Sequence, residues 1–359
     1  MKHVAIIGIQ GVPAKYGGFE TLVENIIGKN CANTVKYTIF CSSKDYAVRR
    51  KEYKDATLKY IPLHANGMQS TPYDIIGMMR TLWGYDAVVI LGVSGCLFLP
   101  VYRLFYHKKL IINIDGLEHR RAKWGKFAKW MLKKSCDYAV RWADVVVADN
   151  QGIRDYVKET YGKDSVLIAY GGDHVMRNTS MEQQKAVLEK YHLQEKKYAI
   201  TICRIEPENN SRIILQAFED SEKELVFVGN WSRNEYSRDL KEHYGQLPNI
   251  HLIESLYDLD ELYALRSQCS FYLHGHSAGG TNPSLVEAMF FGKPILAYDV
   301  VYNRETTQGK AHYFRNVEEL KKLIRIDDSE QEKNGKAMHE IARREYVWTK
   351  IARQYESLY

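Results

Sequence analysis

A glycine-rich segment near the start of the chain carries residue types that bind phosphate. Lys15, Gly17 and Gly18 lie in the segment Gly8–Glu20, which follows the apolar run Val4–Ile9. A turn between a strand and a helix presents backbone N–H groups at the positive end of the helix, and these attract an anion. The spacing matches neither the dinucleotide fingerprint nor the P-loop. The segment therefore predicts an anion site, although a plain tight turn would use the same glycines.

A second glycine-rich segment runs from His274 to Met289. Its centre combines a favoured N-cap, Asn282, with a favoured first helical residue, Pro283. Glu287, one turn into the expected helix, is placed to accept hydrogen bonds from a sugar hydroxyl, although a Glu on a helix is also typical of a solvated surface. The nucleotide-binding residues predicted from both segments are Lys15, Gly17, Gly18, His274, Gly279, Gly280, Thr281, Asn282 and Glu287.

Arg204 is the third candidate, because it directly follows the apolar run Tyr198–Cys203. A guanidinium group binds oxyanions through two parallel hydrogen bonds, which suits a diphosphate. The alternative is a surface arginine paired with Glu206 or Glu208. Two anion sites and an arginine together predict a ligand that contains a diphosphate.

A strongly basic segment lies between Arg103 and Arg141, with eleven Lys or Arg against three Asp or Glu. Its central run, 120–134, has helical spacing with apolar residues on one face, which predicts a basic amphipathic helix resting on anionic lipid. A solvated surface helix is the alternative, and nucleic acid is disfavoured because no recognition motif accompanies the charge. The residues predicted to contact acceptor or membrane are Arg120, Arg121, Lys126, Lys129 and Lys133.

The elements that position these segments alternate between apolar runs and helical spacing. This alternation predicts an α/β protein with two Rossmann-like, doubly wound parallel-sheet domains facing a cleft. Ligands in such sheets bind beyond the carboxyl ends of the strands, where the segments above are expected. The polar stretch 171–185 is interpreted as a linker. We expect domains at 1–175 and 176–345, with a helix at 346–359 that crosses back to the first domain.

Composition narrows the class further. None of the 359 residues belongs to an unbroken apolar run of the ~20 needed to span a bilayer, and Val4–Ile9 is too short for a signal peptide. Six cysteines without a CxxC spacing are expected to be reduced and buried, with no zinc site. These features predict a cytoplasmic protein.

Taken together, the motifs resemble those of the GT-B glycosyltransferases of family 4 along essentially the whole chain. Lys15-Tyr-Gly-Gly18 is similar to the K-x-G-G loop, Arg204 to Glu208 to the segment that holds the donor diphosphate, and Pro283 to Met289 to the end of the E-x7-E motif. The resemblance implies a retaining transfer from a nucleotide sugar without metal or cofactor. It also implies that Glu287 binds the nucleotide's ribose and that Arg204 and Asp115 are the catalytic residues. Asp115 follows the apolar run Leu110–Ile114, where such enzymes carry a group that contacts the donor sugar or the acceptor, and an aspartate that caps a helix or forms a turn is the alternative.

A narrower resemblance is to bacterial rhamnosyltransferases of capsule and cell-wall polysaccharide assembly. It implies dTDP-L-rhamnose as donor and a polyprenyl-diphosphate-linked saccharide as acceptor, with the protein peripheral on the inner face of the plasma membrane. Three positions depart from the family pattern: Cys203 stands for Gly, Asn209 for Lys and Gly279 for Glu. Asn209 is still expected to contact the donor, and the loss of a carboxylate at Gly279 suits a 6-deoxy sugar. A UDP-hexose donor, a nucleotide-sugar 2-epimerase and a non-catalytic nucleotide-sugar-binding protein remain alternatives.

Overall fold

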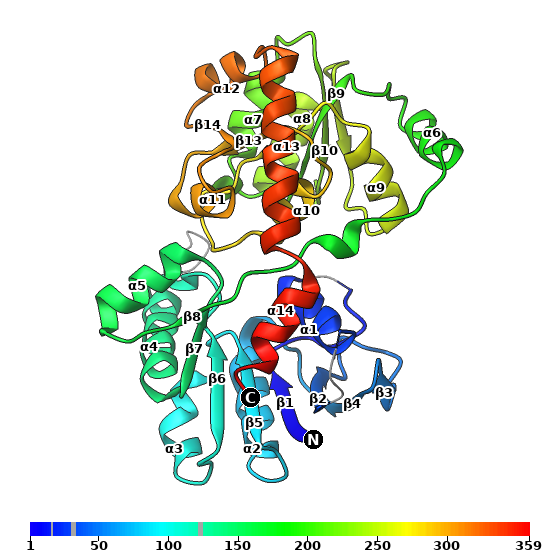
Figure 1. The fold of residues 1–359 in the computed structure, drawn as a ribbon. Coiled ribbons are helices and arrows are strands. Elements are labelled where there is room, and N and C mark those ends of the chain that lie inside the picture. Colours follow the sequence, from blue (N-terminus) through cyan, green and yellow to red (C-terminus); the bar gives the residue numbers. More distant parts are fainter. Residues whose placement is uncertain (16, 30–33, 121–124) are drawn as a thin grey trace. The chain divides into compact units, whose positions relative to one another are not determined.

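A computed structural model describes residues 1–15, 17–29, 34–120 and 125–359. The chain forms two compact units, one made of residues 1–170 together with 348–359, the other of residues 171–347 (Figure 1). Each unit is a sheet of mostly or wholly parallel strands covered by helices. The predicted α/β class with two Rossmann-like domains is confirmed.

The sheet of the first unit has the strand order β3-β4-β2-β1-β5-β6-β7-β8. Every neighbouring pair is parallel except β3 with β4. The central strands are continuous runs of Val, Ile and Leu, as expected for strands buried on both faces. Their bounds are β1 Lys2–Ile7, β2 Val35–Ser42, β3 Glu52–Tyr53, β4 Ala56–Ile61, β5 Ala87–Leu91, β6 Lys109–Asn113, β7 Val145–Ala148 and β8 Val166–Leu167.

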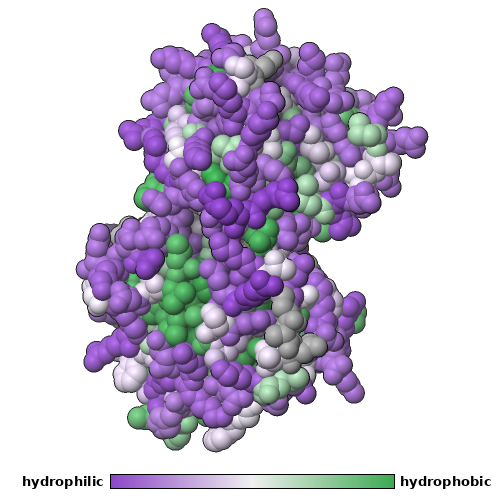
Figure 2. Space-filling view, in the orientation of Figure 1, coloured by the Kyte–Doolittle hydropathy of each residue, from purple (hydrophilic) through white to green (hydrophobic). Residues whose placement is uncertain are grey.

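Helices of the first unit are α1 Gly18–Ile27, α2 Ser70–Arg80, α3 Leu99–Arg103, α4 Lys126–Trp142, α5 Gln151–Tyr161 and α14 Trp348–Glu356, with 3-10 turns η1 Gly67–Gln69, η2 Cys96–Phe98 and η3 Glu118–Arg120. The last helix, α14, packs against α1 and adds Trp348, Ile351 and Tyr355 to the core. Figure 2 shows a patch of apolar residues over β7 and the edge strand β8, where Val166 is exposed.

The sheet of the second unit is parallel throughout, in the order β11-β10-β9-β12-β13-β14. Its strands are β9 Tyr198–Ile202, β10 Glu224–Val228, β11 Ile250–Ile253, β12 Phe271–His274, β13 Ile295–Tyr298 and β14 His312–Phe314. Its helices are α6 Met181–Lys190, α7 Ser211–Phe218, α8 Glu235–Tyr244, α9 Leu259–Ser267, α10 Pro283–Met289, α11 Val301–Thr306, α12 Val317–Leu323 and α13 Asp328–Glu345, with 3-10 turns η4 Asp173–Val175 and η5 Pro207–Asn209.

Three expectations about the elements differ from the structure. The polar stretch expected as a linker contains η4 and the start of α6, which opens with a capping box at Ser180. Residues 171–175 belong to the second unit, where the N–H of Gly172 donates to the carbonyl of Tyr346. The basic helix α4 begins at Lys126 and not at Arg120, and it continues to Trp142.

The cysteines of the described residues are free thiols: Cys41, Cys96, Cys136, Cys203 and Cys269. Burial raises the pKa of Cys41 to about 11 and that of Cys203 to about 12, so both are neutral, unreactive thiols at physiological pH. Cys31 lies outside the described residues.

Candidate functional site

Two separate sequence segments come together at the carboxyl ends of β9 and β12, which are neighbouring strands. The backbone N–H and the hydroxyl of Ser277 donate to the carbonyl of Glu208, at 2.9 and 2.8 Å. The side-chain amide of Asn210 donates to the carbonyl of Gly275 at 2.8 Å. A Cβ atom at Gly275 would lie 2.1 Å from the carbonyl oxygen of Asn209, so this close approach requires glycine. We call residues 203–210 and 274–282 together the loop cluster.

Arg204 lies in the loop cluster with its side chain partly exposed, as the sequence predicted for a residue at a strand end. Its Nη1 is 4.0 Å from Oε1 of Glu206, and Nη1 of Arg233 is 3.9 Å from the same oxygen. The alternative pairing with Glu206 is therefore present, but at a distance too long for a hydrogen bond. Two guanidinium groups share one carboxylate, so these three groups carry a net positive charge.

Asn209 is buried, and its side chain points into its own loop. The side-chain amide donates to the carbonyl of Arg204 at 2.7 Å, and the backbone N–H donates to the carbonyl of Glu206 at 3.0 Å. Asn209 thus holds the loop that carries Arg204 in shape, whereas the sequence led us to expect a direct contact with the donor.

His274 ends β12 and is also buried. Its ring stacks on the ring of His276, with centroids 4.3 Å apart and planes 8° apart. Burial, together with the nearby His276, lowers the pKa of His274 well below its usual range, so the ring is neutral. Neither ring nitrogen of His274 has a hydrogen-bond partner within the described part of the chain. The side chain packs beneath the loop cluster and does not reach its surface.

Helix α10 begins as the sequence predicted, with Asn282 at the N-cap and Pro283 at the first position. The Asn282 side chain makes no capping hydrogen bond, so it leaves the first-turn N–H groups to another acceptor. Gly280 and Thr281 before it are buried. Gly279 has a φ of +123°, a backbone conformation that a residue with a side chain rarely adopts. A Glu at this position, as the family motif has it, would strain this loop.

Glu287 lies on α10 within an ion-pair network. Its Oε2 is 2.6 Å from Nη2 of Arg266, and its Oε1 is 3.6 Å from Nε2 of His174. Neither partner of Glu287 was predicted from the sequence. Arg266 follows Leu262 by four residues and thus lies on the apolar face of α9, a signal that could have identified it. His174 lies in the stretch that was expected to be a linker.

The glycine segment of the first unit is held closely by tyrosines. The hydroxyl of Tyr46 contacts the carbonyl oxygens of Gly11 and Pro13, at 2.9 and 2.7 Å. Lys15 donates to the carbonyl of Asp45 at 2.8 Å and lies 4.4 Å from the centre of the Tyr46 ring. The predicted loop is therefore present, but its lysine is engaged with the segment that follows β2.

Gly17 and Gly18 lie at the start of α1, one turn before a buried carboxylate. Glu20 accepts a hydrogen bond from the N–H of Gln10 at 2.8 Å. Burial raises the pKa of Glu20, and the negative charges of Asp115 and Asp45 raise it further. Glu20 and Asp115 therefore lie close enough to interact, although they follow different strands.

Asp115 directly follows the residue after β6 and has a φ of +61°. Its N–H donates to the side-chain oxygen of Asn113 at 3.0 Å, and the Asn113 amide in turn donates to the hydroxyl of Tyr355 at 2.9 Å. The predicted position of Asp115 at a strand end is thus observed, with its backbone held by buried Asn113.

The basic segment has two aromatic side chains on its surface. Phe127 and Trp130 of α4 are 75% and 57% exposed, and their rings stack with centroids 6.0 Å apart. Lys126 is exposed beside them, and Lys129 is partly exposed. Lys133 differs, because its ammonium lies 2.5 Å from Asp137 and 2.8 Å from the hydroxyl of Tyr161, where it joins α4 to α5. Arg120 ends η3, and Arg121 lies outside the described residues.

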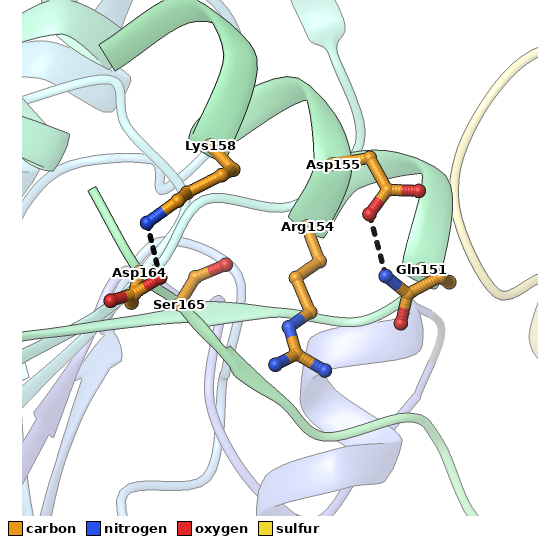
Figure 3. Close-up of a pocket in the computed structure, with 6 residues that line it drawn as sticks. All are labelled: Gln151, Arg154, Asp155, Lys158, Asp164 and Ser165. Carbon is orange, nitrogen blue, oxygen red and sulfur yellow. Dashed lines mark hydrogen bonds and ion pairs between the residues drawn. The ribbon is translucent and has the colours of Figure 1, made fainter. Parts of the chain in front are cut away.

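Within the described residues, no helix combines the length and the apolar character needed to cross a bilayer. A polar hollow of about 280 Å³ lies beside α5 (Figure 3). Lys158 pairs there with Asp164 at 2.8 Å. Its lining contains none of the predicted site residues: Gln151, Arg154, Asp155, Lys158, Asp164 and Ser165.

Comparison with known families divides the chain in the same way as its fold. Residues 1–173 match the model described as "Domain of unknown function (DUF1972)". Residues 182–340 match the model described as "Glycosyl transferases group 1". No curated protein matches the chain in sequence.

Several solved structures are similar to this chain over nearly its whole length. Sucrose-phosphate synthase from Thermosynechococcus elongatus has a TM-score of 0.80 at 15% identity and covers 100% of this chain and 98% of its own. HepE of Anabaena in complex with UDP-glucose has a TM-score of 0.78 at 14% identity, over 100% and 99%. The catalytic domain of starch synthase IV from Arabidopsis thaliana, bound to ADP and acarbose, has a TM-score of 0.73 at 12% identity, over 99% and 98%. At these identities the likeness establishes the fold.

Proposed function

With residues 182–340 forming a glycosyl transferases group 1 domain in a chain of the GT-B fold, we propose that this protein transfers a sugar from a nucleotide-sugar donor to a saccharide acceptor. The observation that carries the proposal is the loop cluster of the second unit. It brings Arg204, the segment 279–282 and the start of α10 to one edge of one sheet.

The donor's diphosphate is bound by Arg204 and by backbone N–H groups of the segment 279–282. The guanidinium groups of Arg204 and Arg233 both lie near the Glu206 carboxylate, and guanidinium groups bind a diphosphate through paired hydrogen bonds. Glu287 accepts a hydrogen bond from the ribose. We leave Lys15 out of the phosphate contacts, because its ammonium is engaged with Asp45 and Tyr46.

The reaction retains the anomeric configuration and needs no metal ion. Its barrier is the departure of the nucleoside diphosphate from an oxocarbenium-like carbon. Arg204 and the loop amides stabilise the charge that develops on the leaving phosphate, which is the kind of electrostatic contribution that dominates many enzymes. The leaving phosphate takes the proton of the acceptor hydroxyl, so no protein base is required. Asp115 contacts the donor sugar or the acceptor.

The donor is dTDP-L-rhamnose. Gly279 supports this choice, because it stands where related enzymes have a carboxylate near the donor sugar, and a 6-deoxy sugar has one hydroxyl fewer to bind. A UDP-hexose is the alternative donor. The two are separated by the binding experiment below.

The acceptor is a saccharide linked to a polyprenyl diphosphate at an anionic membrane surface, in capsule or cell-wall polysaccharide assembly. Support comes from the exposed Phe127 and Trp130 of α4 beside Lys126 and Lys129. Helix α3 packs against α4 and is followed by Leu104 and Phe105, which are also exposed. Apolar side chains ringed by lysines suit the boundary between headgroups and acyl chains.

The proposal is tested by thermal shift with dTDP, UDP, GDP, dTDP-L-rhamnose and UDP-glucose, each with EDTA present. A ligand at 100 times its Kd stabilises the fold by ~2.7 kcal/mol. Stabilisation by dTDP and dTDP-rhamnose, lost in Arg204→Ala and kept in Arg154→Ala, is the expected result. Arg154 is the matched control, because it lies in the separate hollow beside α5. Selective stabilisation by UDP-glucose would exclude rhamnose, and no response to any nucleotide would exclude the transferase.

A further inference from the structure

Arg266 is a buried cation directly behind the carboxylate assigned to the ribose. Its side chain is 4% exposed, and that of Glu287 is 16% exposed. Burying a charge is costly unless an opposite charge and hydrogen bonds compensate it. Within the described residues, Glu287 is the one carboxylate in ion-pair range of Arg266. The guanidinium therefore depends on Glu287, and the orientation of Glu287 depends on the guanidinium.

We propose that Arg266 is a positioning residue that fixes the Glu287 carboxylate for the donor's ribose. The inference rests on the proposed function, in which Glu287 binds that ribose. Arg266 does not touch the ligand in this scheme, because it acts through Glu287 from within the protein.

The geometry separates the tasks of the two carboxylate oxygens. Oε2 is engaged by Nη2 of Arg266 at 2.6 Å, a short, charge-assisted hydrogen bond. Oε1 lies 3.6 Å from Nε2 of His174, which is beyond hydrogen-bond distance. With one oxygen held from inside, the other is oriented to accept a hydrogen bond from a ligand hydroxyl.

The helices that carry Arg266 and Glu287 are packed into the core of the second unit. Arg266 lies near the end of α9, whose residues Leu262, Ala264 and Leu265 are buried. Glu287 lies on α10 between the buried residues Val286 and Ala288. A side chain held by packing and by a fixed partner loses little freedom when it binds a ligand, which increases its contribution to affinity.

The test measures how strongly the protein distinguishes a nucleoside diphosphate from the same molecule without ribose hydroxyls. Titration calorimetry with dTDP and 3′-deoxy-dTDP, and with UDP and 2′,3′-dideoxy-UDP, gives a discrimination ratio for each pair. In the unaltered protein the preferred nucleotide is expected to show a ratio of about 10-fold or more, the size of one hydrogen bond to a charged group. The ratio should fall to about 1 in Glu287→Gln and in Arg266→Met, and Arg266→Lys should recover part of it.

A control variant tests whether removing any arginine ion pair of the second unit changes the discrimination ratio. Arg177 forms a similar ion pair, 2.7 Å from Asp260, on the surface of the same unit. Arg177→Met should leave the discrimination ratio unchanged. The double variant Arg266→Met/Glu287→Gln should show the same discrimination ratio as either single variant, because both single changes remove the same interaction.

The outcomes separate the two claims. A ratio that falls in Glu287→Gln but stays at the unaltered value in Arg266→Met overturns the positioning role and leaves the proposed function intact. If Arg266→Met does not fold, an unchanged ratio in Arg266→Lys overturns the role in the same way. Absence of nucleotide binding in the unaltered protein, or a ratio that Glu287→Gln does not change, overturns the ribose assignment itself and the inference with it.

Discussion

Asp74 combines a carboxyl group with a buried position in the first unit. It lies on α2 and accepts a hydrogen bond from the N–H of Gly95 at 3.1 Å. Burial raises the pKa of Asp74 to about 8, and the hydrogen bond from Gly95 lowers it only in part. The folded protein therefore keeps this carboxyl protonated at neutral pH.

We expect Asp74→Asn to stabilise the protein increasingly from pH 4 to pH 8. An unfolded aspartate ionises near 3.8 and the folded one at about 8, so the unfolded state binds fewer protons between these values. The free energy of unfolding of the unaltered protein thus falls as the pH rises through that window and is level above it. The asparagine side chain still accepts the hydrogen bond from Gly95 but does not ionise, so the free energy of unfolding no longer falls with pH. The gain in stability is a few kcal/mol at pH 8.5, because one pKa unit corresponds to ~1.4 kcal/mol. Urea denaturation at pH 5, 7 and 8.5 measures the difference.

Asp86 is the control, because its pKa is shifted in the opposite direction from that of Asp74. Hydrogen bonds from the N–H of His3 and from Lys108 lower its pKa. The stability it contributes is present above its unfolded pKa and is lost as the pH falls through the lower folded value. Asp86→Asn should therefore weaken the protein equally at pH 5, 7 and 8.5. If the free energy of unfolding of Asp74→Asn differed from that of the unaltered protein by the same amount at all three pH values, the raised pKa of Asp74 would be contradicted.

The sequence identified single residues well where their type alone carries the chemistry. Arg204, Asn282, Pro283 and Glu287 lie at a strand end or helix start, as their order in the chain predicted. Asn209, Arg266 and Asp74 could not be interpreted this way, because their roles depend on partners distant in sequence or on burial. A polar side chain that is satisfied inside the protein has the same letter as one that faces a ligand.

At the scale of elements, α4 has lysines of two kinds. Lys126 and Lys129 lie beside exposed Phe127 and Trp130, whereas Lys133 is engaged by Asp137 and Tyr161. Lys126→Glu/Lys129→Glu should weaken binding to vesicles with anionic lipid at least about 5-fold for each lysine, because losing each lysine removes about 1 kcal/mol near such a surface and each new carboxylate is repelled by it. Lys133→Met should lower the thermal midpoint and leave vesicle binding unchanged. Vesicle co-sedimentation with neutral and anionic lipid tests both statements.

Lys185→Glu/Lys196→Glu is the control for net charge, since both lysines are exposed in the second unit. Equal losses from this change and from the α4 double variant would mean that overall charge, and not α4, governs binding. No vesicle binding by the unaltered protein would remove the proposed membrane surface.

The loop cluster gives a second prediction at this scale. A Cβ at Gly275 would lie 2.1 Å from the backbone oxygen of Asn209, so Gly275→Ala must push the two loops apart. We expect a loss of stability of ~1–3 kcal/mol, the usual cost of overpacking, together with weaker nucleotide binding. Gly125→Ala is the control, because its Cβ would meet no atom of the described residues within 4 Å. If Gly275→Ala bound the nucleotide with unchanged affinity, the contact between the two loops would not be needed for nucleotide binding.

Most strands were predictable because apolar runs of four to six residues that are rich in Val and Ile are too short for a typical helix and are typical of a buried strand. The apolar runs Val4–Ile9 and Tyr198–Cys203 coincide with β1 and β9 to within two residues at each end. The short edge strand β3 and the strand β14 were missed, since neither has a comparable apolar run. The start of α4 was placed too early, because helical spacing alone does not mark where a helix begins.

At the scale of the whole molecule, the two units differ in how their chain closes. All six strands of the second unit come from the continuous segment 171–347. The first unit needs α14 from the far end of the chain, where Trp348, Ile351 and Tyr355 are each 1% exposed. Fully burying one such side chain contributes ~1.5–3 kcal/mol, so the missing helix is comparable to the net stability of a whole domain.

We therefore expect the segment 171–347 to fold alone and residues 1–170 to fail without α14. The isolated second unit should unfold cooperatively and should bind the nucleoside diphosphate preferred by the whole chain, because the loop cluster, Arg266 and Glu287 all lie within it. Residues 1–170 should aggregate or show no cooperative transition, and joining residues 348–359 to them through a flexible linker should restore one. Circular dichroism melting of the three segments, with calorimetry on the second unit, measures these outcomes.

A cooperative transition in residues 1–170 alone would show that the core of the first unit is complete without α14. A folded second unit that binds no nucleotide would instead mean that the donor needs residues of the first unit as well, which would make Asp115 and the glycine segment part of the binding site.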